Sequence, residues 1–538
     1  MWKTRDSCHK IFNPLPQNII NYVNIEHFSR LVMGHPDRTL VNYVINGLKV
    51  GFDIGFKGDI IITQPKNLLS ANQHKIEITK AIITEVQRHH TSGPFQSPPF
   101  ENLHCSPIGA VIKNGKCRLV MDLSQPKGMS INEFINKDDY SVQYTHFDVA
   151  TDLVRQQGVG TYMSKVDIKH AFRLLPVRPD DWPLLGYCWE GQYFVDTRLP
   201  FGLRSSPAIF NQFANLVCWV IKFFYALSKL VHYADDFFLV SKQVEDTARN
   251  ELILLQQAFS YLDIPLGKDK ILGPSTSMTY LGIEINSVDL TISLPQEKYN
   301  DILLELKYWL KRKNCTKQQL LSLIGKLSFV CKVVRPGRIF LRRLINLSTS
   351  VEKLHHHINL NLQTLADIKW WHTFLPTWNK TSIIPDHYET LSSDIHLFTD
   401  ASNIGLGAVY GKAWLQSRWS ERFSLLSIDF KELFAIVAAA STWGSQWEGK
   451  RIVFVTDNLP ITQIWDTGTT KSKEVMNLVR ELFLIAAKKG FSVSMRHIPG
   501  IFNSIADALS RFQEHRFRSL LPDADVLPTD IPPTVWNL

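Results

Sequence analysis

The sequence HYADDFFLV at residues 232–240 places two adjacent acids, Asp235 and Asp236, inside an apolar run. The apolar residues on both sides predict buried strands, so the stretch predicts a hairpin whose turn is Asp-Asp. A polar turn explains the acids on its own, because hairpin turns favour Asp. Two carboxylates this close would also repel each other by about 4 kcal/mol at an effective dielectric constant of about 20. A bound Mg²⁺ would remove that repulsion, so the choice depends on a third carboxylate elsewhere in the chain.

Length and composition indicate a folded protein of several domains with an anionic partner. The 538 residues predict roughly three or four domains, and 45% hydrophobic with 20% charged residues argue against a disordered chain. The formal net charge is +9, and residues 268–346 carry most of it, with 14 Lys and Arg against 6 Asp and Glu. Solvated basic helix faces would explain this excess. Together with the motifs nearby, it favours contact with nucleic acid.

The cysteines and the chain start bear on the compartment. Seven cysteines are scattered without a CxxC pair, which indicates a reducing compartment and neither structural zinc nor a disulfide framework. We find no run of about 18 or more apolar residues and no signal peptide, so we expect no membrane contact. The protein is expected to be intracellular, in the cytoplasm, the nucleus or both, without an evident targeting signal.

A basic hairpin is predicted upstream of the acidic stretch. Two short strands, residues 109–113 and 117–123, flank an Asn-Gly pair, which is the strongest short-range hairpin signal. Lys113 and Arg118 lie on this hairpin, and Arg binds phosphate through a planar fork of donors. The hairpin could therefore fold over a triphosphate. Ordinary surface charge on an exposed hairpin is the alternative.

A third carboxylate and a possible pocket floor lie between the two hairpins. Asp167 ends a short predicted strand, where an Asp often serves as an N-cap, and Phe172 follows five residues later. A large ring beside Asp167 could exclude a ribose 2′-hydroxyl, although Phe172 as simple core is equally compatible with the sequence. The LPFG loop holds Phe201 and Gly202, and Gly202 would let the backbone approach a base or sugar. Lys268 lies in a basic turn after the acidic hairpin.

The order of these motifs over residues 96–285 resembles a retroelement reverse transcriptase. A finer similarity, to DIRS-type retrotransposons, rests on HPDRTLVNYVINGLKVGFDIGF (35–56), SPIGAVIKNGKCRLVMDLSQPKGMSIN (106–132) and GKLSFVCKVVRPGRIFLRRL (325–344). Gypsy-type elements share the core motifs and are the close alternative. The resemblance implies a right-hand polymerase in which Asp167, Asp235 and Asp236 hold two Mg²⁺ ions, with Mn²⁺ as a possible substitute. It also implies nucleotide contacts from Lys113, Arg118, Phe172, Phe201, Gly202 and Lys268.

A second set of acids follows a different pattern, in residues 395–510. The pattern predicts three strands, a helix and a fourth strand, and the ends of these strands are expected to converge. Asp400 follows the first strand, Glu432 lies on the helix, and Asp457 ends the fourth strand. Asp507 lies on a later short helix, ten residues after His497. Each acid alone has an ordinary explanation as a cap or turn residue.

Taken together, this second set resembles a ribonuclease H domain, and HIPGIFNSIADALSR (497–511) matches the retroelement version. The resemblance implies that the four carboxylates hold two Mg²⁺ ions, which position an attacking water and stabilise the leaving 3′-oxygen. It also implies that His497 assists proton transfer or product release. The expected fold class is therefore a mixed α/β, multidomain chain with a right-hand polymerase followed by a ribonuclease H-like mixed sheet. The expected domains are an N-terminal helical and loop extension (1–95, ending in a Pro-rich connector), fingers and palm (96–285), thumb and connection (286–390), ribonuclease H (391–512) and an extended Pro-rich tail (513–538).

These expectations point to a two-activity enzyme. One half would be an RNA-directed DNA polymerase that extends a DNA primer with dNTPs on an RNA or DNA template. The other half would be an endonuclease that hydrolyses the RNA strand of RNA–DNA hybrids. A catalytically degenerate or domesticated nucleic-acid-binding protein is the alternative from another class, and a DNA-templated polymerase is a third. The sequence leaves the oligomeric state open.

Overall fold

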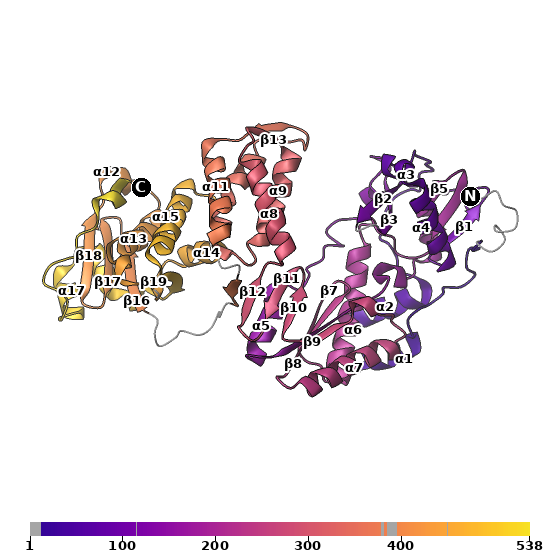
Figure 1. The fold of residues 1–538 in the computed structure, drawn as a ribbon, viewed down its shortest axis with the longest axis horizontal. Helices are drawn as coiled ribbons and strands as arrows, with labels where there is room; N and C mark the ends of the chain where they lie inside the picture. The colour runs from indigo at the N-terminus through magenta and orange to yellow at the C-terminus, as the bar shows by residue number, and fades with distance from the viewer. Residues whose placement is uncertain (1–11, 114–115, 378–380, 385–394, 449, 538) are drawn as a thin grey trace. The chain divides into compact units, whose positions relative to one another are not determined.

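The structure is a computed structural model that describes residues 12–537, except 114–115, 378–380, 385–394 and 449. It divides into two compact units, residues 1–291 and 292–538. Both mix helices and strands (Figure 1), which confirms the mixed α/β class. The first unit contains α1 (Ile25–Leu31), α2 (Arg38–Val50), α3 (Leu69–Gln73), α4 (Lys75–Gln87), β1 (Thr91–Phe95), β2 (Ile108–Lys113), β3 (Lys116–Met121), α5 (Phe147–Gln157), β4 (Tyr162–Asp167), β5 (Gly186–Trp189), β6 (Gln192–Asp196), α6 (Ser206–Phe224), β7 (Leu230–Tyr233), β8 (Asp236–Ser241), α7 (Glu245–Tyr261), β9 (Leu272–Ser275), β10 (Ser277–Tyr280) and β11 (Ile283–Asn286).

One sheet of the first unit, in the order β7-β8-β4-β9, carries its acids at strand ends. The hairpin differs from the expected one by one position. Tyr233 pairs with Asp236, so the turn is Ala234-Asp235 and not Asp-Asp. Ala234 has φ of 51°, in the left-handed region that such two-residue turns require. Asp236 is therefore the first residue of β8, where pairing with β4 fixes its position.

Helix α6 contributes a long apolar face to the core of the first unit. Pro207 lies in its first turn, where the missing N–H has no helical partner to lose. Most of the helix is buried, including Phe210 and Phe213. By length and composition alone α6 could cross a membrane, but core helices of this kind pass the same test.

The N-terminal segment packs into the same core as the acid-bearing sheet. One buried cluster extends from Val23 to Ile264, so the boundary expected near residue 95 does not divide the compact units. The stretch expected to be a Pro-rich connector, residues 92–100, begins within strand β1, which pairs with β6. Of its three prolines, Pro94 lies in β1, and Pro98 and Pro99 follow the strand.

Residues 277–286 form a tight hairpin. Strands β10 and β11 pair directly, and Tyr280 lies opposite Ile283. Leu281 and Gly282 form the turn with φ values of 47° and 78°. Two successive positive φ values are typical of the tight turn that joins twisted antiparallel strands, so Gly282 serves as a turn residue and not as a bulge.

The second unit consists of a helical part followed by a five-stranded sheet. The sheet order is β18-β17-β16-β19-β20, with β16, β19 and β20 parallel. Helix α13 packs on β16 and β17 (Figure 1). The elements are α8 (Gln296–Trp309), β13 (Asn314–Thr316), α9 (Lys317–Val330), α10 (Arg342–Ser348), β14 (His357–Asn359), α11 (Leu362–Thr377), β15 (Thr381–Ile383), β16 (Ile395–Ala401), β17 (Gly405–Tyr410), β18 (Ala413–Arg418), α12 (Glu421–Ser424), α13 (Ile428–Trp443), β19 (Arg451–Thr456), α14 (Leu459–Thr467), α15 (Lys473–Lys489), β20 (Ser492–His497), α16 (Ser504–Ser510) and α17 (Glu514–Leu520), with β12 (Thr291–Ser293) at the division between the units.

The second sheet follows the expected strand and helix order. Ser427 caps α13 by accepting a hydrogen bond from the Phe430 amide. Asp429 accepts one from the Asn458 side chain. The stretch expected to be an extended tail contains helix α17, whose Phe517 is buried against β18 through Trp414. Proline content in the last residues concealed this helix.

A buried ion network ties α4 to β6 in the first unit. The Arg173 guanidinium lies 3.1 Å from the Glu85 carboxylate and 2.6 Å from that of Asp196. Glu85 also contacts His90 at 3.0 Å. Burial raises the pKa of Glu85, but the Arg173 charge and the His90 contact outweigh it and lower that pKa to about 2. Removing Glu85 would leave part of the buried Arg173 charge without a partner.

We therefore expect Glu85→Gln to lower the free energy of unfolding at neutral pH by about 3 kcal/mol. Because the folded pKa of Glu85 lies below its unfolded value, its contribution is complete above about pH 4.5 and is lost as the pH falls toward about 2. Denaturant unfolding should be measured at neutral pH and near pH 4. The difference in unfolding free energy between the wild type and Glu85→Gln should be smaller at the lower pH. Glu77→Gln, an exposed position on the same helix, is the control, and an equal loss in both variants would contradict the network.

Candidate functional site

The first acidic centre is built by strand pairing. In the register of β4 and β8, Asp167 lies opposite Asp236. The amide of Ile168 donates a 3.0 Å hydrogen bond to the carbonyl of Asp235, which ties the hairpin turn to the end of β4. The structure thus brings the three predicted acids Asp167, Asp235 and Asp236 to one edge of the sheet.

Burial and charge crowding shape the electrostatics of this centre. Burial, followed by the charge of Asp167, raises the pKa of Asp235. Burial also raises the pKa of Asp236, although the ammonium of Lys165 opposes this. One oxygen of Asp236, Oδ1, is buried and has no hydrogen-bond partner in the described part of the chain. Burial of Asp235 and Asp236 is therefore only partly offset by the positive charge around them.

Two lysines that the sequence analysis did not single out contact these acids. Lys270 Nζ lies 2.6 Å from Asp167 Oδ1, and Lys165 Nζ lies 3.1 Å from Asp236 Oδ2. Lys165 could have been found, because it is two residues before Asp167 on the same strand and shares its face. Lys270 comes from a turn after α7, and only tertiary structure brings it here. The predicted Lys268 lies two residues before Lys270 and is exposed, and it forms no ion pair with an acid in the described part of the chain.

Three of the predicted nucleotide-contact residues lie together: two phenylalanine rings and one guanidinium group. The rings of Phe172 and Phe201 lie 5.3 Å apart, and the Arg118 guanidinium lies 5.6 Å from the Phe201 ring. Packing alone explains why residue 202 is a glycine. Gly202 has a φ of 104°, and a Cβ atom there would lie 2.3 Å from the Met121 carbonyl oxygen. Close packing against β3 is therefore sufficient to require glycine. The side chain of Lys113 lies outside the described residues.

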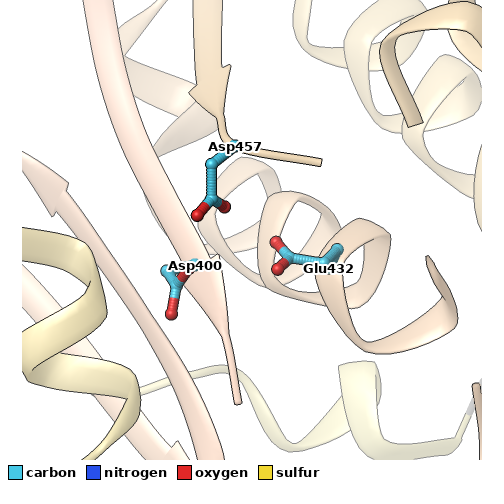
Figure 2. Close-up of side chains that lie close together, drawn as sticks. All are labelled: Asp400, Glu432 and Asp457. Carbon is cyan, nitrogen blue, oxygen red and sulfur yellow. The ribbon is translucent and has the colours of Figure 1, made fainter. Parts of the chain in front are cut away.

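The second acidic centre is tighter. Asp400 on β16, Glu432 on α13 and Asp457 after β19 point toward one another (Figure 2). One oxygen from each carboxylate lies within 4.8 Å of the other two. The parallel pairing of β16 with β19 places Asp400 and Asp457 at the same sheet edge. Among the residues that the structure describes, this is the one group of three such ligands at that spacing, and the first centre does not meet it.

Burial and crowding in the second centre disfavour the ionised form of its carboxyl groups. Burial, followed by the charges of Asp400 and Asp457, raises the pKa of Glu432 well above its usual range. Burial raises the pKa of Asp400 to about 6, even though Ser510 Oγ donates a 2.5 Å hydrogen bond to it. Three crowded carboxylate oxygens are the ligands that hard divalent cations such as Mg²⁺ and Mn²⁺ prefer. The donor set therefore fits such a cation.

The other two predicted residues lie outside this group. Asp507 is near enough for its charge to raise the pKa of Asp400, but its own oxygens contact Arg511 at 2.5 Å and Arg516 at 2.6 Å. Burial raises the pKa of Asp507, and the two arginines lower it below its usual value. His497 is exposed at the end of β20, opposite Thr456 in the strand register. Neither arginine was predicted from the sequence to contact Asp507.

Comparison with known proteins assigns the first centre. Residues 109–285, which contain Asp167, Asp235 and Asp236, match the family described as reverse transcriptase (RNA-dependent DNA polymerase). Residues 109–285 are therefore similar to reverse transcriptase domains. The chain is also similar to the Tf2-3 and Tf2-7 transposon polyproteins of Schizosaccharomyces pombe (strain 972 / ATCC 24843), with 24% and 23% identity over 481 residues, or 85% of this chain and 32% of each relative. The chain thus spans about a third of the length of these polyproteins.

Solved structures with a related course of the chain come from foamy virus. The protease-reverse transcriptase dRH in complex with double-stranded DNA aligns with a TM-score of 0.49 and 14% identity, over 90% of this chain and 84% of that one. The protease-reverse transcriptase in complex with RNA/DNA hybrid aligns with a TM-score of 0.47 and 14% identity, over 90% and 64% of the two chains. The reverse transcriptase domain therefore rests on the family match and on the position of its acids.

The second centre generates a prediction about metal binding. We expect the full chain to bind Mn²⁺, and Glu432→Gln to bind one ion fewer, because the variant removes one of three converging ligands. Electron paramagnetic resonance of free Mn²⁺ during a titration measures this number directly. Glu514→Gln removes an exposed acid from α17 and is the control. Equal Mn²⁺ binding by wild type and Glu432→Gln would show that the cluster holds no ion.

Proposed function

We propose that the chain is the RNA-directed DNA polymerase and ribonuclease H of a retroelement. The polymerase would extend a DNA primer with dNTPs on RNA and DNA templates. The observation that carries the proposal is the strand register that sets Asp167 against Asp236 beside Asp235, within residues that match the reverse transcriptase family. Stretches 35–56, 106–132 and 325–344 favour a DIRS-type element, while the Tf2 similarity keeps a gypsy-type element open.

In the polymerase half, Asp167, Asp235 and Asp236 would hold the divalent cations. When bound, such ions lower the pKa of a primer 3′-hydroxyl and neutralise the triphosphate. The protein's own contribution is positioning, because the pairing of β4 with β8 fixes two of the carboxylates before any substrate arrives. Lys165 and Lys270 partly neutralise the acids in the meantime. Phe172 and Phe201 would form the floor on which the sugar and base lie.

In the ribonuclease H half, Asp400, Glu432 and Asp457 would hold the cations. When bound, these ions supply an activated water at neutral pH. Ser510 fixes the orientation of the Asp400 carboxylate through its 2.5 Å hydrogen bond. Asp507 and His497 would act at the edge of this group. Cleavage confined to RNA requires recognition of the 2′-hydroxyl, which is the local difference between RNA and DNA.

The extent of the similarities supports two activities on one chain. The family match covers residues 109–285, whereas the Tf2 similarity covers 85% of the chain and so extends well beyond that domain. Copying RNA into DNA leaves a hybrid, and synthesis of a second DNA strand needs the RNA removed. Template RNA, primer DNA, the hybrid and dNTPs are the partners that this cycle requires.

One observation favours the alternative of a nucleic-acid-binding protein without catalysis. Lysine ammonium groups lie on two carboxylates of the first centre, at 2.6 Å and 3.1 Å. An ammonium group can stand where a cation would bind, so this centre could be permanently neutralised. Primer extension on RNA template across Mg²⁺ and Mn²⁺ decides between the two, because a binding protein would incorporate nothing.

Paired variants should separate the two activities. We expect Asp235→Asn to abolish DNA synthesis and to leave hybrid cleavage within about twofold of wild type, because the two centres lie in different compact units. Glu432→Gln should do the reverse. Both activities are measured on one labelled hybrid substrate, with extension and cleavage resolved by length. Loss of both activities in either variant would contradict the assignment of one activity to each centre.

Discrimination between ribonucleotides and deoxynucleotides tests the proposed role of Phe172 beneath the sugar. We expect Phe172→Val to increase ribonucleotide incorporation relative to deoxynucleotide by about tenfold or more, because a smaller side chain leaves room for the 2′-hydroxyl, at roughly 1.4 kcal/mol for each factor of ten. Phe172→Tyr keeps the ring and serves as the matched control. The measurement is the ratio of kcat/KM for the two nucleotides. An unchanged ratio in Phe172→Val would assign Phe172 to the core alone.

A further inference from the structure

A strongly basic cavity of about 340 Å³ lies within the second unit, between α10, α11 and the first turn of α15. None of its lining residues is an Asp or a Glu. The remaining polar lining residues are mainly amides and hydroxyls, which can donate hydrogen bonds. Five cationic side chains line it: Arg342, Arg343, Lys471, Lys473 and Arg480.

Most of this positive charge is not neutralised by the protein. Asp367 is the one carboxylate that pairs with the set in the described part of the chain, at 2.9 Å from Arg343 and 3.7 Å from Arg480. Within the same described residues, no ion pair is formed by Arg342, Lys471 or Lys473. The cavity therefore holds an excess of positive charge that the fold itself does not require.

Helix α15 adds to this field. It begins at Lys473 after the N-cap Ser472, whose side chain accepts a hydrogen bond from the Val475 amide. The helix has 17 residues, so its dipole presents partial positive charge and unpaired N–H groups at this end. Helix starts of this kind bind phosphate when other donors converge on them.

Two buried lining residues have polar atoms that the protein leaves without a partner. Thr364 is 1% exposed, and its hydroxyl makes no hydrogen bond in the described structure. Arg480 is 7% exposed, and its Nε is likewise unpartnered. Unsatisfied buried donors are rare because burying them without a partner is unfavourable. Both residues line the cavity, so a hydrogen-bond acceptor bound there would lie beside them.

We propose that this cavity binds a phosphate group of the nucleic-acid backbone. Phosphate matches the features above, since it carries negative charge and presents only acceptor oxygens. We favour a phosphate of the nucleic-acid backbone over a free phosphate because the cavity continues a basic segment. Arg338 precedes α10 and lies against Gly468. Gly468 comes just before Thr470 and Lys471, which line the cavity. This source rests on the proposed function, in which the second unit holds an RNA–DNA hybrid. The cavity would then fix where the duplex backbone crosses the second unit.

The first test is hybrid binding by a variant of two exposed lysines. Lys471→Gln/Lys473→Gln changes exposed side chains of the cavity, and Lys412→Gln/Lys450→Gln makes the same charge change at exposed positions outside it. Binding of a labelled RNA–DNA hybrid to the full chain is measured by fluorescence anisotropy over a range of salt, with Glu432→Gln present throughout to prevent cleavage. We expect the cavity variant to lose about tenfold in affinity and to lower the salt slope by roughly one for each phosphate contact removed. The control should change by less than about twofold, and equal losses in both would reduce the effect to overall charge and overturn the proposal.

A second variant reports on the cavity without changing charge. Thr364→Val keeps the shape of the side chain and removes the unpartnered hydroxyl. If the hydroxyl serves a ligand, hybrid affinity falls severalfold while the thermal midpoint of the free protein stays equal or rises. A lower midpoint with unchanged affinity would mean that Thr364 is structural, and this would count against the site.

Inorganic phosphate tests whether the cavity binds a free phosphate or a phosphate of the nucleic-acid backbone. The wild type should gain thermal stability in phosphate relative to chloride at equal ionic strength, and the cavity variant should gain less. Phosphate stabilisation combined with unchanged hybrid affinity would assign the cavity to a free phosphate and overturn the backbone as its occupant. No difference in either assay would overturn the site altogether. Failure of the wild type to bind hybrid at all would refute the proposed function, while the phosphate comparison would still decide whether the cavity is an anion site.

Discussion

Repulsion between carboxylates held at strand ends is the constraint around which both acidic centres are built. Strand pairing fixes Asp167 against Asp236 in one sheet, and parallel pairing brings Asp400 and Asp457 to one edge of the other. Side chains held by backbone register cannot move apart to relieve their charge. Burial, with a further contribution from the neighbouring carboxylates, raises the pKa values of Asp235, Asp236, Asp400 and Glu432. Such strain persists only where the surrounding fold is stable enough to hold it, here large buried cores around each sheet.

The sequence was sufficient to predict where each acid of the two centres lies along its strand or helix, because alternation of apolar residues marks strands and their ends. It did not predict the turn at Ala234-Asp235, since hairpin register depends on which residues pair and not on which are polar. Lys165 was predictable from its place on the same face as Asp167. Lys270, Arg516 and the basic cavity were not, because each depends on segments far apart in the chain. Helix α17 was concealed by the prolines around it.

The family match and the geometry support each other to different degrees in the two units. In the first unit, a domain match and a register of acids coincide over the same residues. In the second unit only the geometry indicates a site, because the tighter cluster of Asp400, Glu432 and Asp457 lies outside the family match at residues 109–285. The contact of Asp507 with two arginines is a further difference from the expected set of four equivalent ligands. The C-terminal helix that supplies Arg516 is thus part of the electrostatics of that centre.

The two centres offset their negative charge in different ways. The first carries its own counter-ions in Lys165 and Lys270, whereas burial and neighbouring carboxylates in the second raise the pKa of Glu432 and raise that of Asp400 to about 6. Cation uptake would therefore be an exchange against ammonium groups in one unit and a release of hydrogen ions in the other. Acidification should weaken the second centre's hold on its ions, because protons compete for the same carboxylate oxygens. The same bulk ion concentration could then leave the two halves of one polypeptide unequally loaded.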